Sequence, residues 1–478
     1  MARKGLEGGS YKPLSEDDIA QIHDTSMRVF EDVGFQINSD KALTFFQDAG
    51  AAVDGRIVRL PREAVMELVA RAHSEVTLYG RHREHHITLG GTRVYAGTGG
   101  TALNVIDTAS GERRQATLHD LKRITKLIDG LENIHFFLLP TYPNDVPAAN
   151  VDVNRFFAGL DNTAKHVMGG IYTPQGINQV IRMAEIIAGS ADKLCQEPVI
   201  SMIVCAISPL KIDRIYGDMI VTIAQAGIPI ALPAEPLCGA TSPVTLAGNL
   251  VIQNVDSLTE VCLTQLVNPG TPVIYGSVAS SADLRDLKYI AGAIEMGLLN
   301  AAGAQLAQFY RLPFYATAGM SDAKTIDAQC GYESALSSLL CALGGANFIH
   351  DAAGLLDFAL SVSYEKYVVD NEIIGMVMRA VEGIKVDEDT LAFDLIKEVG
   401  PGGNFVSAKH TRKYMRTEHY QPTLSDRDHL EEWQAKGKRD TYARARNRVE
   451  EILAAPGYRL PDEVRQRIIN EIPGILDI

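Results

Sequence analysis

The sequence is poor in the features that mark secreted and membrane-bound proteins. Only six cysteines occur in 478 residues, and no two of them form a C-x-x-C pair, so we expect reduced thiols in a reducing compartment. No stretch reaches the roughly 18 uncharged apolar residues of a membrane span, and the opening residues carry no apolar region of a signal peptide. These absences predict a soluble, cytoplasmic protein without membrane contact.

Basic residues are also few. Lys and Arg together number 45 against 59 Asp and Glu, which gives a formal net charge of −14 and a pI of about 5.4. An acidic surface repels phosphate backbones, so we expect no nucleic-acid partner. The charge is compatible with a cationic ligand but does not indicate one, because many cytosolic proteins are acidic.

The middle of the chain alternates short apolar runs with segments of helical periodicity. No G-x-G-x-x-G motif follows the first run, which argues against a Rossmann fold. Eight runs start 30 to 43 residues apart, the length of a strand, a helix and two loops. They begin near Val94, His135, His166, Val199, Pro229, Pro272, Pro313 and Ala346. The pattern predicts an α/β fold, a (β/α)8 TIM barrel.

Helix signals fall between these runs. One predicted helix spans 177–187, with Thr173 as its N-cap and Gly189 as its stop. Another spans 211–226 and ends at Gly227. We predict three parts: an N-terminal α+β extension over 1–93, the barrel over 94–385, and a helical C-terminal extension over 386–478 that packs on the barrel.

The active site of such a barrel lies at the carboxyl ends of its strands. Four tyrosines stand near these ends: Tyr95, Tyr142, Tyr172 and Tyr275. Aromatic faces attract quaternary ammonium groups, so the four are candidates for a cation site, although each could equally be barrel packing. Two further residues at strand ends, Glu235 and His350, are candidate substrate ligands; His350 could also be structural.

Several motifs resemble those of the trimethylamine methyltransferase superfamily. They are Gly319-Met320-Ser321-Asp322-Ala323-Lys324, the stretch from Asp327 to Glu333, Gly345-Ala346-Asn347, Asn300 to Ala307, Ser363-Tyr364-Glu365-Lys366, and Thr98-Gly99-Gly100-Thr101. The resemblance runs over nearly the whole chain. Archaeal members carry pyrrolysine on a barrel loop. That position falls within 318–322 here, and the middle of this segment is Gly319, Met320 and Ser321, with no pyrrolysine. The chain is therefore similar to the non-pyrrolysine members.

The resemblance implies transfer of a methyl group from a small quaternary amine (glycine betaine, proline betaine or carnitine) to Co(I) of a separate corrinoid protein. It implies no cofactor bound tightly to this chain, a corrinoid protein as partner, and a homo-oligomer. The loop Gly319 to Ser321 would be the catalytic loop, and Thr98, Gly99, Gly100 and Asp322 would face the corrinoid. A quaternary nitrogen leaves as a neutral amine, so no acid–base pair and no metal on this chain are required.

Other classes remain open. Lys324 could form a Schiff base in a lyase or aldolase, although an ion pair with a nearby aspartate is an alternative. A zinc-dependent methyltransferase would use Cys205, Cys238 or His350. The run from Arg81 to His86 resembles a set of metal ligands, but a solvated, charged turn is the simpler interpretation. A non-catalytic betaine-binding protein is a further alternative. The carboxylate of a betaine could be held by His350 or by the backbone amides of Gly99 and Gly100.

Overall fold

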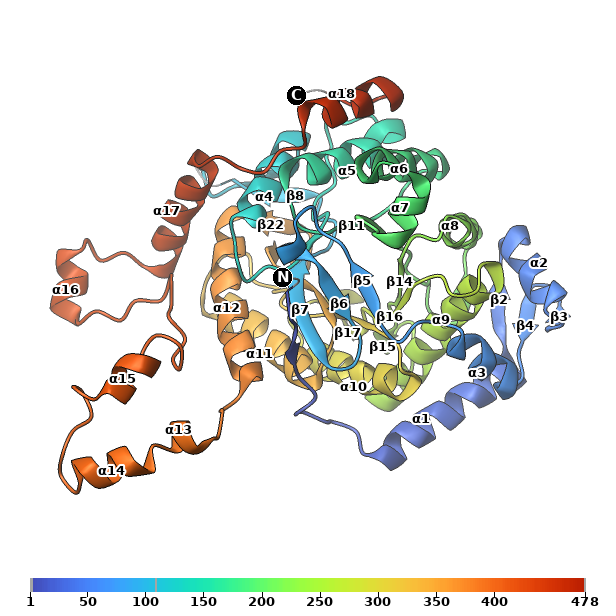
Figure 1. The fold of residues 1–478 in the computed structure, drawn as a ribbon. Coiled ribbons are helices and arrows are strands. Elements are labelled where there is room, and N and C mark those ends of the chain that lie inside the picture. The colour runs from blue at the N-terminus through green and yellow to red at the C-terminus, as the bar shows by residue number, and fades with distance from the viewer. Residues whose placement is uncertain (1–2, 108–109, 477–478) are drawn as a thin grey trace.

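One large, mainly parallel sheet organises the chain in the computed structural model, which describes residues 3–107 and 110–476 (Figure 1). Its strands follow the order β1-β7-β20-β19-β16-β14-β12-β11-β10. All neighbours from β7 to β10 run parallel, whereas β1 joins β7 antiparallel. The strands are β1 (Leu6–Glu7), β7 (Arg93–Thr98), β10 (Phe137–Leu138), β11 (Val167–Gly170), β12 (Ile200–Ile203), β14 (Ile230–Ala234), β16 (Val273–Ser277), β19 (Phe314–Thr317) and β20 (Phe348–Ala353).

The eight parallel strands begin within two residues of the predicted positions, so the predicted succession of strands is confirmed. The continuous ladder does not run on from β10 to β7. These two strands are connected instead by isolated parallel bridges, Gly97 to Phe136 and Ala102 to Thr141. The Thr98 hydroxyl adds to this connection, because it donates to the carbonyl of Leu138 at 2.7 Å.

Helices separate the strands along the chain. They are α4 (Leu118–Asp129), α5 (Val151–Asn162), α6 (Pro174–Ala188), α7 (Ala191–Gln196), α8 (Arg214–Gln225), α9 (Leu246–Val267), α10 (Ile294–Tyr310), α11 (Ala328–Gly344) and α12 (Tyr364–Glu382). The predicted helix over 177–187 is α6, capped by Thr173 and stopped by Gly189 at φ +98°. The prediction for 211–226 was wrong at its start, because Lys211–Ile212 forms strand β13, which pairs with β2.

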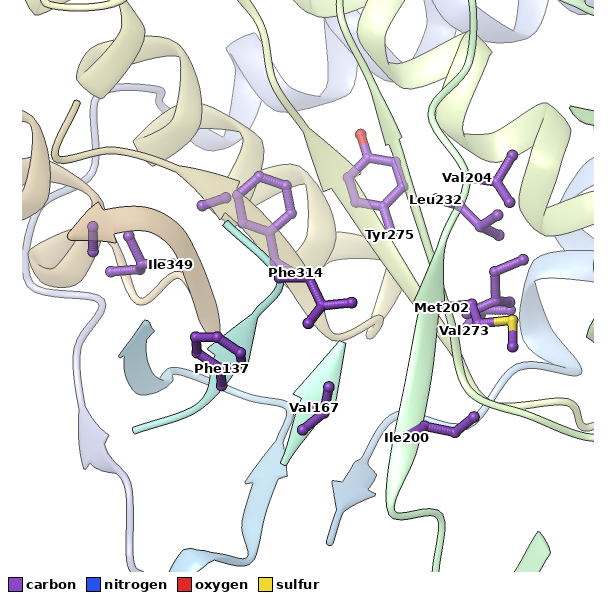
Figure 2. Close-up of a cluster of buried hydrophobic side chains, with 14 of the residues drawn as sticks. Phe137, Val167, Ile200, Met202, Val204, Leu232, Val273, Tyr275, Phe314 and Ile349 are labelled. Atoms are coloured by element: carbon purple, nitrogen blue, oxygen red, sulfur yellow. The ribbon is translucent and has the colours of Figure 1, made fainter. Parts of the chain in front are cut away.

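The two faces of the sheet have different partners. Outward-pointing residues such as Val167, Leu232 and Phe314 meet the helices and form the larger apolar core (Figure 2). Inward-pointing residues form a second, smaller cluster with a hairpin of β5 (Val76–Leu78) and β6 (Ile87–Leu89). This inner cluster contains Val76, Leu78, Ile87, Leu89, Tyr95, Phe136, Leu138, Met168, Ala231, Ile274, Tyr315 and Phe348. The hairpin packs against residues near the amino ends of strands such as β7, so the carboxyl ends and their loops are left for a site.

Smaller elements precede and interrupt this arrangement. The N-terminal ones are α1 (Glu16–Arg28), a π-helical turn over Val29–Val33, β2 (Phe35–Ile37), α2 (Asp40–Asp48), β3 (Ala52–Asp54), β4 (Ile57–Arg59), α3 (Arg62–Ala70) and a 3-10 turn at Arg83–His85. The loops after the large strands hold β8 (Asn104–Ile106), β9 (Arg113–Gln115), β13 (Lys211–Ile212), β15 (Leu237–Cys238), β17 (Ser280–Asp283), β18 (Lys288–Ile290), β21 (Leu355–Leu356) and β22 (Ser361–Ser363). A 3-10 turn at Ala148–Asn150 leads into α5.

The C-terminal part is helical, as predicted, with α13 (Glu388–Leu391), α14 (Phe393–Val399), α15 (Lys409–Tyr414), α16 (Leu430–Ala435), α17 (Thr441–Ala454) and α18 (Asp462–Glu471). Helix α17 packs on α12 and α4, and α18 packs on α6. All six cysteines are free. Across residues 3–107 and 110–476, no helix is long and apolar enough to cross a bilayer.

Candidate active site

His350 lies in the middle of β20, level with Thr317 at the carboxyl end of β19, on the inward side of the sheet. Its Nδ1 lies 2.9 Å from the Thr317 hydroxyl and 3.1 Å from the Ala316 carbonyl oxygen. Its Nε2 lies 2.7 Å from a carboxylate oxygen of Asp351, and its ring stacks on Tyr315 with the centroids 4.4 Å apart. Both ring nitrogens are therefore engaged within the protein, which fixes the orientation of the imidazole.

Asp351 adopts an unusual backbone conformation beside His350. Its φ is +63°, and the pairing of β20 with β7 shifts register just here. Left-handed backbone at a non-glycine residue costs of order 1–3 kcal/mol and is common at functional sites. A side chain on Gly99 would place its Cβ 2.2 Å from Asp351 Oδ1 and 2.5 Å from His350 Cδ2. Glycine at position 99 is thus what lets these two side chains occupy the carboxyl end of the barrel-like sheet.

Glu235 follows β14 and faces the same region. Burial, together with the nearby Asp351 carboxylate, raises the pKa of Glu235 to about 6, while His350 partly opposes the rise. The side chain can still be reached by water, although protein atoms surround most of it. Two carboxylates close together give a negative potential that favours a cation.

Two buried tyrosine hydroxyls lie near these carboxylates. Neither the Tyr289 nor the Tyr315 hydroxyl has a hydrogen-bond partner within the described residues, and the same holds for Asp351 Oδ1. Burial and the carboxylates of Glu235 and Asp351 raise the pKa of both tyrosines well above the usual range. Buried polar atoms without partners are costly in an otherwise well-bonded core, and they mark a place where a ligand or water can bind. We call Glu235, Tyr289, Tyr315, His350 and Asp351 the acidic recess.

Sequence reasoning missed Tyr289 and Tyr315. Tyr315 sits in the middle of a strand and resembles ordinary core. Tyr289 lies on β18, in the long excursion after β16, where the sequence carries no motif. Only the folding back of that excursion, with β18 pairing antiparallel to β17, brings its ring to the recess.

Tyr142 and Tyr172 meet at the same edge of the sheet. Their rings make an edge-to-face contact with centroids 5.4 Å apart, and the guanidinium carbon of Arg155 lies 5.0 Å from the Tyr172 ring centroid. Tyr172 also lines a cavity of about 360 Å³ together with Cys205 and Tyr216. Burial and Glu235 are among the causes that raise the pKa of the Cys205 thiol well above its usual range. Cys205 thus connects this cavity to the acidic recess.

The other two predicted tyrosines lie elsewhere, which corrects the expectation that they form part of a cation site. The Tyr95 hydroxyl donates to the main-chain oxygen of Arg3 at 3.2 Å, and its ring belongs to the inner cluster near the β5–β6 hairpin. Tyr275 points outward to the helices (Figure 2), where its hydroxyl donates to Asn254 on α9 at 2.9 Å. Both are packing residues.

The predicted catalytic loop is buried and tightly held. Gly319 has φ +90° and would collide with Ala352 if it carried a Cβ, at 2.6 Å from Cα. The Ser321 hydroxyl donates to Glu333 at 2.6 Å, and Met320 is 1% exposed. Beneath the loop, Lys366 is fully buried and donates to the Gly319 carbonyl at 3.4 Å.

Lys366 forms a buried ion pair that fixes two loops at once. Its ammonium group lies 2.7 Å from both carboxylate oxygens of Asp370. The same carboxylate accepts the Gly354 amide at 2.7 Å. The loops after β19 and β20 are therefore held by one pair on α12, and removing either charge would leave the other uncompensated in the core.

The residues expected to face a corrinoid divide into two groups. Thr98 is fully buried between β7 and β10, and Asp322 accepts the amides of Ala291 and Gly292 at 2.9 and 3.1 Å. These two side chains are committed inside the protein, so the expectation is corrected for them. Gly99 lies beneath Asp351, and Gly100, at φ +77°, is partly exposed at the edge of the recess.

The alternative chemistries receive little support from the geometry. Lys324 is exposed, donates to the Asp322 carbonyl at 2.7 Å and lies 4.0 Å from the Phe358 ring centroid, whereas a Schiff-base lysine is desolvated. Within the described parts of the chain, no group of three His, Cys, Asp or Glu is arranged to hold a metal ion. The run from Arg81 to His86 forms a short turn near the hairpin, away from the recess.

The fold and the site together define a parallel α/β protein with an acidic, aromatic recess at the carboxyl ends of its strands, where enzymes of this architecture carry their active sites. Comparison with known proteins refines this class. A family profile described as Trimethylamine methyltransferase (MTTB) matches residues 5–469. This chain belongs to that family and is a methyltransferase-family enzyme.

Individual relatives cover nearly the whole chain. The glycine betaine methyltransferase of Desulfitobacterium hafniense (strain Y51) is 36% identical over 447 residues, which cover 93% of this chain and 92% of that protein. The trimethylamine methyltransferase MttB of D. hafniense (strain DSM 10664 / DCB-2) is 35% identical over 474 residues, 99% and 95% of the two chains. The solved Methanosarcina barkeri monomethylamine methyltransferase is similar with a TM-score of 0.48 and 15% identity, covering 93% of this chain and 95% of that chain.

Proposed function

We propose that this enzyme transfers a methyl group from a small quaternary amine, of the glycine betaine, proline betaine or carnitine type, to the cobalt of a corrinoid protein. The observation that carries the proposal is the acidic recess. Glu235 and Asp351 supply negative charge, and the partly exposed Tyr289 supplies aromatic surface, at the place where the strands end. A quaternary ammonium group binds by Coulombic and cation–π contacts, and because it carries no N–H it needs no hydrogen-bond acceptor from the protein.

The recess also explains how so few catalytic groups suffice. When bound, the corrinoid of the partner supplies a strongly nucleophilic cobalt, and the amine leaves with an uncharged nitrogen. The residues of this chain bind the cation, orient one methyl group outward and exclude water. Positioning of this kind is worth roughly 7–11 kcal/mol when two reactants are held in line. No proton needs to be delivered, which agrees with an imidazole whose two nitrogens are both engaged.

The surface around the recess fits a protein partner. Exposed apolar side chains stand on loops after five different strands, and they are Leu103, Ile207, Val244, Leu284 and Leu360. Exposed apolar residues gathered around a polar site are typical of a protein-binding surface. We therefore place the corrinoid protein over the carboxyl ends of the strands, with the partly exposed Gly100 leaving room for its approach. We also propose that the sheet is a complete (β/α)8 barrel, closed between β7 and β10.

The two named relatives differ in their substrate and have nearly equal identity to this chain, 36% and 35%. The choice of a quaternary amine rests instead on the loop with ordinary residues at Gly319 to Ser321 and on the recess. The decisive assay mixes the purified protein with reduced cobalamin and glycine betaine, proline betaine, carnitine, choline or trimethylamine. Methylation of the cobalt is measured by the change in the absorption spectrum of the cobalamin.

Methylation by one or more quaternary amines is expected. Activity with trimethylamine alone, or with no member of the panel, would overturn the proposal. Tyr275→Phe serves as a matched control, because Tyr275 lies on a strand of the same sheet but faces the helices. The variant should prefer the same methyl donors as the parent. Trapping by borohydride would instead support the lyase alternative, and stoichiometric zinc in the purified protein would support the zinc enzyme.

The carboxylate of a betaine also needs a partner. His350 is in the recess, but its nitrogens are occupied by Thr317, Ala316 and Asp351. Of the two backbone amides that were expected as alternatives, Gly99 is covered by Asp351, so we favour the amide of the partly exposed Gly100 for this role. His350→Ala should then weaken the binding of choline and the binding of glycine betaine equally. A loss of tenfold or more for glycine betaine, with choline spared, would assign the carboxylate to His350 instead.

A further inference from the structure

The turn that joins β5 to β6 carries the charged run from Arg81 to His86, which the acidic recess does not use. The backbone of this turn is fastened to the sheet at two points. The Tyr79 amide donates to the Pro198 carbonyl at 3.1 Å, and the Arg81 amide donates to the Ala164 carbonyl at 2.6 Å. Because these carbonyls belong to the segments that lead into β12 and β11, the turn is held against the amino ends of those strands.

A small cavity lies between this turn and α7. Its volume is about 220 Å³, and its lining includes Arg81, Arg83 and His86 from the turn, with Lys193 and Glu197 from the α7 segment. Drug-sized ligands occupy roughly 300–1,000 Å³, so this cavity suits a smaller molecule. Three of its side chains are cationic and one is acidic, although the chain as a whole has a net charge of −14. The cavity is therefore a local reversal of the charge of the molecule.

The protein does not neutralise the charge of Arg81. The Nη2 group donates to the Val199 carbonyl at 2.9 Å, whereas Nε and Nη1 are buried and have no hydrogen-bond partner among the described residues. Burial lowers the pKa of Arg81 to about 10, and the group that opposes this fall is Tyr458, not a carboxylate. The guanidinium still carries its charge at neutral pH, and a buried charge without a counter-ion is costly. An anion in the cavity would remove that cost.

The other two cations of the cavity also lack a counter-ion. Within residues 3–107 and 110–476, no carboxylate forms an ion pair with Arg83 or Lys193, and Glu197 forms none with any cation. The side chains of Arg83 and Lys193 are exposed, so each can turn toward a ligand. Like charges around one cavity repel each other, and a bound anion would offset this repulsion.

His86 adds an uncharged donor to the same cavity. Its Nδ1 accepts the Gly80 amide at 3.2 Å, which leaves the proton of the neutral imidazole on Nε2. Burial lowers the pKa of His86, and the charges of Arg83 and Arg81 add to the fall. The imidazole is therefore neutral near pH 8 and can donate one hydrogen bond. Guanidinium, ammonium and N–H donors are the groups with which proteins hold oxyanions.

We propose that this cavity binds a small oxyanion of the phosphate type, either free phosphate or the phosphate group of a small monoester. Arg81 supplies the inner charge, Arg83 and Lys193 close over the anion from the surface, and His86 donates from Nε2. Three cations and one acid leave two positive charges in excess, which a doubly charged anion matches better than a single carboxylate does. The anion joins the β5–β6 turn to α7, and its binding depends on neither the methyl donor nor the corrinoid protein.

The test is equilibrium dialysis of the full-length protein against radiolabelled inorganic phosphate at about pH 8, with sodium chloride added to keep the ionic strength constant. The parent should bind one phosphate per chain with a Kd below about 1 mM. Competition with glycerol phosphate distinguishes the two sources of the anion. Displacement at least tenfold more effective than that by unlabelled phosphate assigns the site to a monoester, and equal or weaker displacement assigns it to the free ion.

Two variants locate the binding. Arg83→Gln combined with Lys193→Gln should weaken phosphate binding at least tenfold, and Arg81→Met should abolish it. Arg28→Gln combined with Lys41→Gln is the matched control, because it removes two charges from exposed positions on α1 and α2; it should bind as the parent does. Phosphate should also raise the midpoint of thermal unfolding of the parent but not that of Arg81→Met, because a ligand stabilises only a fold that binds it.

Three results would overturn the proposal. The first is a parent that binds no phosphate, and the second is an Arg83→Gln, Lys193→Gln variant that binds it as tightly as the parent. The third is an equal loss in the Arg28→Gln, Lys41→Gln control, because binding would then follow the net charge alone. The substitutions at Arg83 and Lys193 are on the surface and should leave the fold intact, so their result decides the matter even if Arg81→Met does not fold.

Discussion

Replacing Glu235 by glutamine tests the acidic recess most directly. Burial and Asp351 raise the pKa of this carboxyl from its ordinary 4.5 to about 6. The folded state therefore favours the neutral form of Glu235. The stability that this preference contributes is fully present below the ordinary pKa of 4.5, and it is lost as the pH rises through the folded-state pKa of about 6. A shift of this size corresponds to about 2 kcal/mol, and screening of a side chain that water can reach lowers it to about 1 kcal/mol.

Glu235→Gln should thus raise the free energy of unfolding by about 1 kcal/mol near pH 8, and the gain should vanish near pH 4.5. Binding should change in the opposite direction. A quaternary ammonium group has no titratable proton, so any pH dependence of its binding belongs to the protein. The affinity of the parent should fall as the pH drops through about 6 and should level off about tenfold lower, because the neutral carboxyl then resembles the glutamine of the variant.

The glutamine variant should bind choline about tenfold more weakly near pH 8, a loss of about 1.4 kcal/mol, and should show a nearly flat pH profile. Titration calorimetry between about pH 5 and pH 8 measures both effects, and urea unfolding measures stability. Glu63→Gln, on the exposed face of α3, is the control and should change neither. Equal affinity and equal pH profiles for parent and Glu235→Gln would refute the assignment of this carboxylate to the cation.

Three further substitutions test the frame of the site. Gly319→Ala should destabilise the protein by more than about 2 kcal/mol and abolish methyl transfer, because its backbone conformation and the contact with Ala352 exclude a Cβ; normal thermal unfolding would contradict this. Lys366→Met should cost about 3–5 kcal/mol in urea unfolding, and adding Asp370→Leu should recover part of the loss, because the double variant leaves no uncompensated charge. Tyr172→Leu should weaken binding of a quaternary amine by about 0.5–2 kcal/mol while Tyr172→Phe should not; equal binding by the leucine variant would make Tyr172 a packing residue.

Local sequence determined much of the framework. Each of the eight apolar runs became a parallel strand near its predicted start, because such runs are buried on both faces in a sheet of this type. The ends of α6 could also be predicted from the sequence, since a threonine cap and a glycine in the left-handed region start and end a helix through contacts within a few residues. The family resemblance, carried by motifs such as Gly319 to Lys324, was confirmed by the profile and the relatives.

The tertiary structure alone decided which side chains reach the site. In the run Val273-Ile274-Tyr275 every residue is apolar or aromatic, so the sequence does not show which alternate residues point inward; the structure sends Ile274 inside and Tyr275 to the helices. Strand β13 formed where a helix was predicted, because Lys211 and Ile212 pair with β2, far away in the sequence. The same holds for the recess, whose members come from three separate segments: Glu235 follows β14, Tyr289 lies on β18 and Asp351 lies on β20. Their shared potential depends on distances in space, which adjacent residues in a chain do not encode.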